Sequence, residues 1–182
     1  MAGLEELSLS ERLRHAQDLK DKAADVYKRE LYSEAREFWE QALGILPRDE
    51  ANEEVLKLSL SLHLNLAMAA LQLKDFEGVI QATEEVLKSQ PENAKALYRR
   101  GLAYEAQGRI QPAASDMLKA AKLEPQNAGI RKKYEELKKK VLELREAADT
   151  GEDLDDRPPV HDLAKLPRVF LSIQVGDREP VR

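Results

Sequence analysis

The chain has 182 residues, of which 42% are hydrophobic and 35% are charged, and its formal net charge is −5 at pH 7. This length accommodates one folded domain with an extension. An acidic balance argues against general affinity for nucleic acid or for an anionic membrane, since both favour a strongly basic surface. The absence of cysteine excludes disulfides, thiol catalysis and cysteine-based zinc sites.

Targeting signals are not evident in the sequence. No uninterrupted apolar run approaches the length of a transmembrane helix, and the first residues, from Met1 to Glu6, lack the basic start and apolar core of a signal peptide. We therefore expect a soluble cytoplasmic or nuclear protein that binds neither membranes nor nucleic acid.

Helical periodicity begins near the N-terminus. A first helix is expected from Ser8 to Leu31, where Ser8 and Glu11 can form a capping box. Ser33 opens a second helix that Pro47 stops. The very short turn between the two helices predicts an antiparallel pair.

Three more helices follow in the middle of the chain. The apolar pattern predicts a long third helix over residues 50–74. Asp75 caps a fourth helix that ends before Pro91, and Asn93 caps a fifth that is broken at Gly108.

The last two helices are expected from Gln111 to Leu123 and from Asn127 to Ala147. The seventh helix combines an apolar stripe with many lysines. Such a helix can cover the exposed flank of a repeat array, because stacked repeats need a cap. A basic amphipathic helix of this kind could instead be a calmodulin target.

The C-terminal part has a different character. Residues 148–166 read as an acidic, solvated linker, and residues 167–182 as a lone strand or the start of a following domain. The acidic run from Glu152 to Asp156 could alternatively fold back as an internal mimic of an acidic ligand. The stretch from Pro167 to Gly176 resembles the opening strand of a cyclophilin, but the catalytic part of that domain is absent, so no residues here carry isomerase activity.

The prolines reveal a repeat. Pro91 and Pro125 are 34 residues apart, and Pro47 ends an equivalent segment, which places repeats at 16–49, 60–93 and 94–127. In the third repeat, the packing and turn positions of a tetratricopeptide repeat are filled by Leu97, Gly101, Tyr104, Gly108, Ala113, Ala120 and Pro125. The prediction is an all-α, right-handed superhelix of three tetratricopeptide helix pairs over residues 8–147, with the helix at 127–147 as the cap.

The start of the third repeat carries two basic residues that could bind an acidic ligand. Lys95 and Arg99 lie four residues apart on one helix face, where like charges repel by a few tenths of a kcal/mol in an isolated helix. We expect both side chains to be exposed on the groove wall, and their arrangement is more natural if an acidic group lies between them. The alternative is a solvated basic face without a ligand.

These patterns resemble the tetratricopeptide co-chaperones of the immunophilin type over residues 12–146. The resemblance rests on the ten-residue extension before the second repeat and on the segments 64–68 and 95–101. It implies a co-chaperone or adaptor that binds the acidic C-terminal peptide of a ninety- or seventy-kilodalton heat-shock chaperone through a five-position carboxylate clamp. The positions that match the clamp are Lys20, Asn65, Lys95 and Arg99, whereas the fifth, usually asparagine, is Ala24.

No residues indicate an enzyme, a metal site or a cofactor. His15, His63 and His161 lack paired metal-ligand spacing, and the aspartates at 153–156 lack the glycine and distal glutamate of a calcium loop. We expect a non-catalytic protein without cofactor. The alternative to chaperone binding is a scaffold that binds another partner through its grooves.

Overall fold

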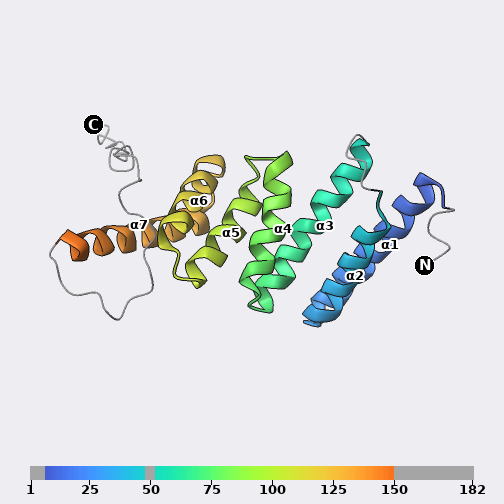
Figure 1. Cartoon of the computed structure of the whole chain (residues 1–182), viewed down its shortest axis with the longest axis horizontal. Coiled ribbons are helices and arrows are strands. Elements are labelled where there is room, and N and C mark those ends of the chain that lie inside the picture. The colour runs from blue at the N-terminus through green and yellow to red at the C-terminus, as the bar shows by residue number, and fades with distance from the viewer. Residues whose placement is uncertain (1–6, 48–51, 150–182) are drawn as a thin grey trace, which may run out of the picture.

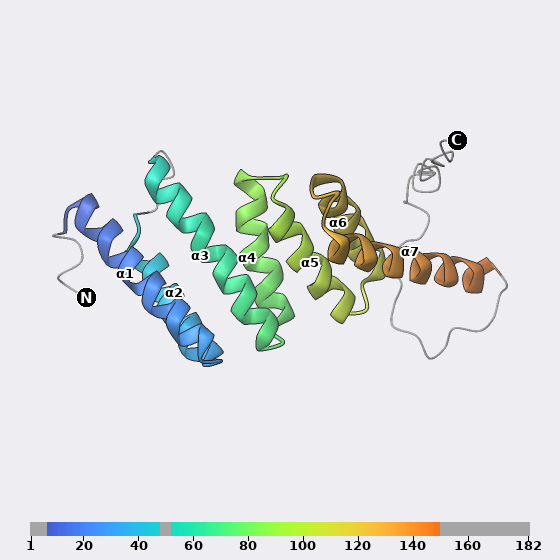
Figure 2. The same cartoon turned by 180° about the vertical axis from the view of Figure 1, so that it is seen from behind.

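The computed structural model describes residues 7–47 and 52–149, which form seven α-helices and no strand. The helices are α1 (Leu9–Lys28), α2 (Tyr32–Ile45), α3 (Glu53–Gln72), α4 (Phe76–Ser89), α5 (Ala94–Ala106), α6 (Ile110–Leu123) and α7 (Ala128–Asp149). Helices α1 and α2, α3 and α4, and α5 and α6 pack as pairs, and α7 packs on α6. The pairs follow one another in a row, with α7 at the far end (Figures 1 and 2). The predicted all-α repeat fold is therefore confirmed.

Side-chain caps set where five of the helices begin, and the cap of α7 is Asn127, whose Oδ1 accepts the Ile130 amide over 3.3 Å. Ser8 and Glu11 form the predicted capping box, and Asp75 and Asn93 cap α4 and α5 as expected. The third helix begins at Glu53 rather than at residue 50, because Asn52 Oδ1 accepts the first free amides of the helix. That bond satisfies donors that have no partner inside the helix.

The turn inside each helix pair contains one left-handed residue. These residues are Glu30 (φ 62°), Lys74 (φ 58°) and Gly108 (φ 73°). The amide of the next residue closes the helix end in all three turns, with Leu31 donating to Val26 O, Asp75 to Ala70 O and Arg109 to Tyr104 O. This shared motif ends α1 at Lys28, three residues before the predicted boundary.

Small residues allow the paired helices to approach closely. Gly101 is buried, and a Cβ added there would lie 3.0 Å from Met117 Cε and 3.3 Å from the carbonyl oxygen of Ala113. In the first pair, Trp39 is only 1% exposed and packs among buried alanines. A large side chain thus fills the space that its small neighbours leave open.

Helix α3 is the central element of the array. It contacts α1, α2, α4 and α5. Within the described part of the chain, it is the one helix that could cross a membrane by length and composition alone. Its packing against four helices accounts for its apolar composition.

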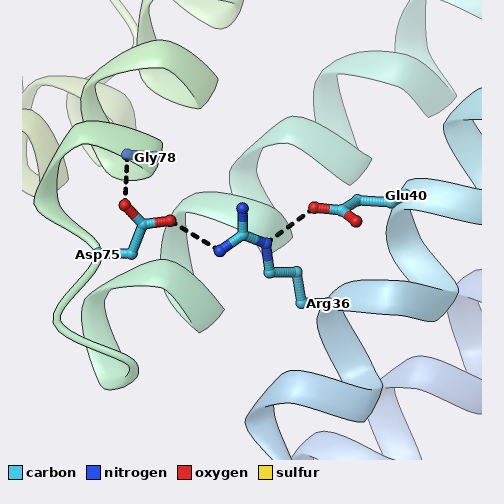
Figure 3. Close-up of polar contacts among 4 residues, drawn as sticks. All are labelled: Arg36, Glu40, Asp75 and Gly78. Atoms are coloured by element: carbon cyan, nitrogen blue, oxygen red, sulfur yellow. Dashed lines mark hydrogen bonds and ion pairs between the residues drawn. The ribbon is translucent and has the colours of Figure 1, made fainter.

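An ion pair links the first two helix pairs. Arg36 Nη1 on α2 lies 2.7 Å from Asp75 Oδ2, while Asp75 Oδ1 accepts the Gly78 amide over 3.0 Å and so caps α4 (Figure 3). The Gly78 amide and then Arg36 lower the pKa of Asp75. Asp75 therefore stabilises both the start of α4 and its spacing from α2.

Helix α7 covers the end of the array as predicted. Ile130 and Leu137 on its apolar stripe are buried, at 5% and 0% exposed. Lys133 and Lys140 pair with Glu105 on α5, over 2.8 and 2.7 Å. Burial alone would raise the pKa of Glu105, but these two lysines hold it below its usual value. Burial of Ile130 and Leu137 leaves less of the apolar stripe available for a calmodulin complex.

Helix α7 runs to Asp149, slightly beyond the predicted boundary at residue 147. The remainder of the predicted acidic linker, residues 150–166, lies outside the described residues. The predicted strand or domain start at 167–182 lies outside them as well.

Candidate peptide-binding face

The first helix of each pair contributes to one face of the array. Helix α3 contacts both α1 and α5, so the three helices lie side by side. The four predicted site residues, Lys20, Asn65, Lys95 and Arg99, come from these helices. We call the surface that carries them the clamp face.

Lys20 lies at one end of the clamp face. It is half-buried and lines a cavity of about 470 Å³ with Gln17 on α1 and with Glu54 and Lys57 on α3. The backbone of Lys20 is held from behind, because Trp39 Nε1 on α2 donates to its carbonyl oxygen over 3.3 Å. The buried tryptophan thus helps to orient the turn that presents Lys20.

Arg99 lies deeper than the sequence suggested. We expected it to be exposed beside Lys95, but its side chain is half-buried, and Nη1 donates to the carbonyl oxygen of Leu64 over 2.7 Å. Burial lowers the pKa of Arg99, an effect that nearby Tyr27 opposes. An arginine remains charged despite such a shift. The predicted exposure is wrong because α3 and α5 pack closely enough to cover most of this side chain.

Asn65 and Lys95 lie near this contact. Asn65 is half-buried and follows Leu64 directly on α3. Lys95 is exposed in the first turn of α5 and lines a cavity of about 830 Å³ that also includes Leu64, Asn93 and Leu123. Arg99, Asn65 and Lys95 therefore cluster around one short segment of α3.

Two polar residues that sequence reasoning missed join the three helices. Tyr27 on α1 lies close enough to Gln72 on α3 and to Arg99 on α5 for both to influence its phenol. Burial raises the pKa of Tyr27, whereas Gln72 and Arg99 oppose that rise. A signal existed in the sequence, since Tyr27 lies three residues after Ala24 and helical spacing places both on one face.

Aromatic packing holds Tyr27 in place. Its ring centroid lies 5.0 Å from that of Tyr32 and 5.7 Å from that of Trp39. Ala24 is half-buried one turn earlier on the same helix. The side of the clamp face around Ala24 is therefore bordered by a fixed tyrosine.

The chemistry of this face suits an anionic ligand. Lysine and arginine offer charged donors, and an asparagine amide can donate without adding charge. Within residues 7–47 and 52–149, no group of histidine, aspartate and glutamate side chains could hold a metal ion. His63 lies elsewhere, on the opposite side of α3.

Comparison with known proteins agrees with the repeat assignment. The family model described as "Tetratricopeptide repeat" matches residues 94–127, which are the bounds predicted for the third repeat. The chain is 36% identical to FK506-binding protein 59 of Drosophila melanogaster over 128 residues, which is 69% of this chain and 29% of that protein.

Solved structures show the same arrangement. The C-terminal tetratricopeptide-containing domain of a Plasmodium falciparum FK506-binding protein matches 79% of this chain and 99% of its own length, with 29% identity and a TM-score of 0.73. The myosin chaperone UNC-45 of C. elegans matches 75% of this chain and 14% of its own, with 29% identity and a TM-score of 0.63. UNC-45 has been solved in complex with a Hsp90 peptide and with a Hsp70 peptide.

The curated relatives are longer proteins. This chain spans between 21% and 38% of the length of six of them. Several are named peptidyl-prolyl isomerases, but the tetratricopeptide repeat is a protein-interaction fold, and the FKBP catalytic domain is not covered. The chain thus carries a tetratricopeptide-repeat domain homologous to the FKBP-type immunophilin co-chaperones.

Proposed function

We propose that the chain is a non-catalytic co-chaperone adaptor that binds the acidic C-terminal peptide of a ninety- or seventy-kilodalton heat-shock chaperone. Lys20, Asn65, Lys95 and Arg99 hold the peptide in this proposal. We further propose that it is located in the cytoplasm or nucleus.

One observation carries the proposal. Arg99 Nη1 on α5 donates to the carbonyl oxygen of Leu64 on α3 over 2.7 Å, and Tyr27 on α1 lies near Arg99. A ligand on the clamp face can therefore touch all three repeats at once. The peptide complexes of UNC-45, whose fold this chain shares, support the same choice of partner.

The expected ligand carries two carboxylates on one residue. A chain-terminal aspartate offers both a side-chain and a main-chain carboxylate, and converging cations can distinguish it from an internal acidic residue. Contacts with charged groups contribute roughly 1.5–3 kcal/mol each. Lys95 is exposed, so part of this affinity is subject to screening by salt.

Calorimetric titration with a peptide that ends in Glu-Glu-Val-Asp tests the proposal. Amidation of the peptide C-terminus removes one carboxylate and is the matched control. We expect measurable binding of the free acid, much weaker binding of the amide, and a decline of affinity as salt rises. Equal binding of the two peptides would favour the alternative of a scaffold for another partner.

A further inference from the structure

A second surface lies on the face of α3 opposite the clamp face. His63 and Asn65 are two residues apart on α3, so their side chains project about 200° apart around the helix axis. Two adjoining cavities open on the His63 side, and both are lined by His63 and Glu85. We call their combined space the α2–α4 groove, because α2 and α4 form its walls and α3 its floor.

One half of the α2–α4 groove is lined mainly by apolar residues. Its cavity has a volume of about 480 Å³ and is lined by leucines of α3 and of the C-terminal end of α2. Leu46 and Leu60 are buried there, whereas Leu43 and Leu56 are half-buried and so still accessible. An apolar side chain of a partner could pack against this second pair.

The other half is acidic. Its cavity of about 470 Å³ is lined by Glu40, Glu84, Glu85 and Arg36 as its charged residues. Three glutamates and one arginine leave two net negative charges if His63 is neutral, and Lys88, which pairs with Glu85 from outside the lining, reduces this to one. Burial lowers the pKa of His63, which agrees with a neutral imidazole near pH 7.

The arginine is already engaged. Arg36 Nε lies 2.8 Å from Glu40 Oε1, and its Nη1 contacts Asp75 (Figure 3). Its positive charge is therefore already compensated by two carboxylates, which reduces its attraction for an incoming acid. Because the same ion pair joins α2 to the start of α4, it also holds the two groove walls in position.

The dimensions suit a short helix. The lining residues of α3 extend from Val55 to Ala70, which is about 22 Å along a helix. A helix of about 15 residues has this length, and its apolar face could enter the groove as the anchor residues do in other helix-in-groove complexes.

We propose that the α2–α4 groove binds a basic amphipathic helix of a partner protein, with aliphatic side chains beside Leu43 and Leu56 and a lysine or arginine beside Glu84 and Glu85. Charge complementarity selects this occupant over an acidic one. The surface is separate from the clamp face, so both can be occupied together.

The test uses a synthetic 15-residue helix of leucine and lysine, acetylated and amidated so that it has no terminal carboxylate for the clamp face. Its affinity for the full chain is measured by fluorescence anisotropy, and the bound surface by amide chemical-shift changes. We expect changes at α2, at α4 and on the His63 side of α3. A counterpart with glutamate in place of lysine should bind at least about tenfold more weakly.

Matched variants separate the groove from general charge effects. Glu84→Lys with Glu85→Lys should weaken binding of the leucine–lysine helix at least about tenfold. Glu37→Lys on α2 with Glu77→Lys on α4 makes the same total charge change on the two groove walls, at exposed residues outside the groove lining, and should weaken it far less. Lys95→Ala should leave this affinity unchanged while it weakens binding of the chaperone peptide.

Several outcomes would overturn the proposal. Equal losses in the two double variants would show non-specific attraction, and shift changes at the clamp face or none at all would exclude the groove. If the amide chemical shifts of the groove residues depend on protein concentration without peptide, the occupant of the groove is a second copy of the chain. A change of those shifts in Phe170→Asp would assign it to the chain's own C-terminal segment.

Discussion

Arg99 on α5 donates through Nη1 to the carbonyl oxygen of Leu64 on α3 over 2.7 Å, and Leu64 directly precedes Asn65 in the chain. One guanidinium therefore joins two repeats and also belongs to the proposed clamp. A guanidinium has five donors, so the bond to Leu64 leaves others for a ligand. This double role distinguishes Arg99 from Lys95, which is exposed.

Lys95→Ala and Arg99→Ala should therefore differ in their effect on stability. We expect each to raise the dissociation constant of the chaperone peptide about 10- to 100-fold, since each removes a charged donor. Only Arg99→Ala should also lower the melting temperature, because it leaves the Leu64 carbonyl without this partner. Calorimetric titration and thermal unfolding measure the two effects. A folded Lys95→Ala protein with unchanged affinity would falsify the clamp assignment.

Ala24→Asn should tighten peptide binding. The substitution restores a side-chain donor at the position where the sequence departs from the co-chaperone pattern, and a neutral hydrogen bond contributes about 0.5–1.5 kcal/mol. The gain corresponds to a few-fold to about tenfold lower dissociation constant. If affinity does not improve, Tyr27 or another neighbour already meets the same ligand atom, which Ala24→Asn combined with Tyr27→Phe would reveal.

The left-handed residues in the turns predict opposite effects on stability for Gly108→Ala and Lys74→Gly. Gly108→Ala should lower the free energy of unfolding by about 1 kcal/mol, because a left-handed conformation is costly for a residue with a Cβ. Lys74→Gly should raise it by a few tenths of a kcal/mol, since relief of that strain is partly offset by the larger entropy of the unfolded chain. Urea unfolding measures both. Destabilisation by Lys74→Gly would show that its side chain contributes more than the strain costs.

Asp75 combines two contributions that substitution can separate. Asp75→Ala should lower the free energy of unfolding by about 1–2 kcal/mol, because it removes both the cap of α4 and the pair with Arg36. Asp75→Asn retains a good cap and should cost less than about 1 kcal/mol, since the pair is about one-third exposed. The loss of unfolding free energy in Asp75→Asn should be smaller still in about 1 M salt, which screens the ion pair. Equal losses for the two variants would mean that the cap contributes nothing.

His63 should make stability depend on pH. Burial is the main cause of its lowered pKa, opposed by Glu85 and assisted by Lys88. The unfolded chain then takes up a proton more readily than the folded one, so stability is fully present above the ordinary value of 6.5 and is lost as pH falls through the folded pKa. Between pH 8 and 5, about the range in which histidine titrates, His63→Gln should flatten the decline in melting temperature. His15→Gln, at an exposed site, should retain the wild-type slope.

Local signals in the sequence were sufficient to predict the repeat architecture. The proline spacing located the third repeat at 94–127, and the caps at Ser8, Asp75 and Asn93 are as expected. Such features depend on residues within about one helical turn of each other, or on a repeat length, and both are visible in a linear sequence. The composition of residues 127–147 likewise indicated a helix that covers the last repeat.

Contacts between repeats depended on the tertiary structure. The bond from Arg99 to Leu64 and the pair of Arg36 with Asp75 join residues 35 and 39 positions apart. The burial of Arg99 and the separation of the α2–α4 groove from the clamp face arise in the same way. These features depend on how closely and at what angle whole helices pack, which is determined by many side chains together. The sequence alone therefore determined which residues the helices carry and, to within about one helical turn, where the helices begin and end. Packing decided which of those residues meet, which are covered and which remain open to a partner.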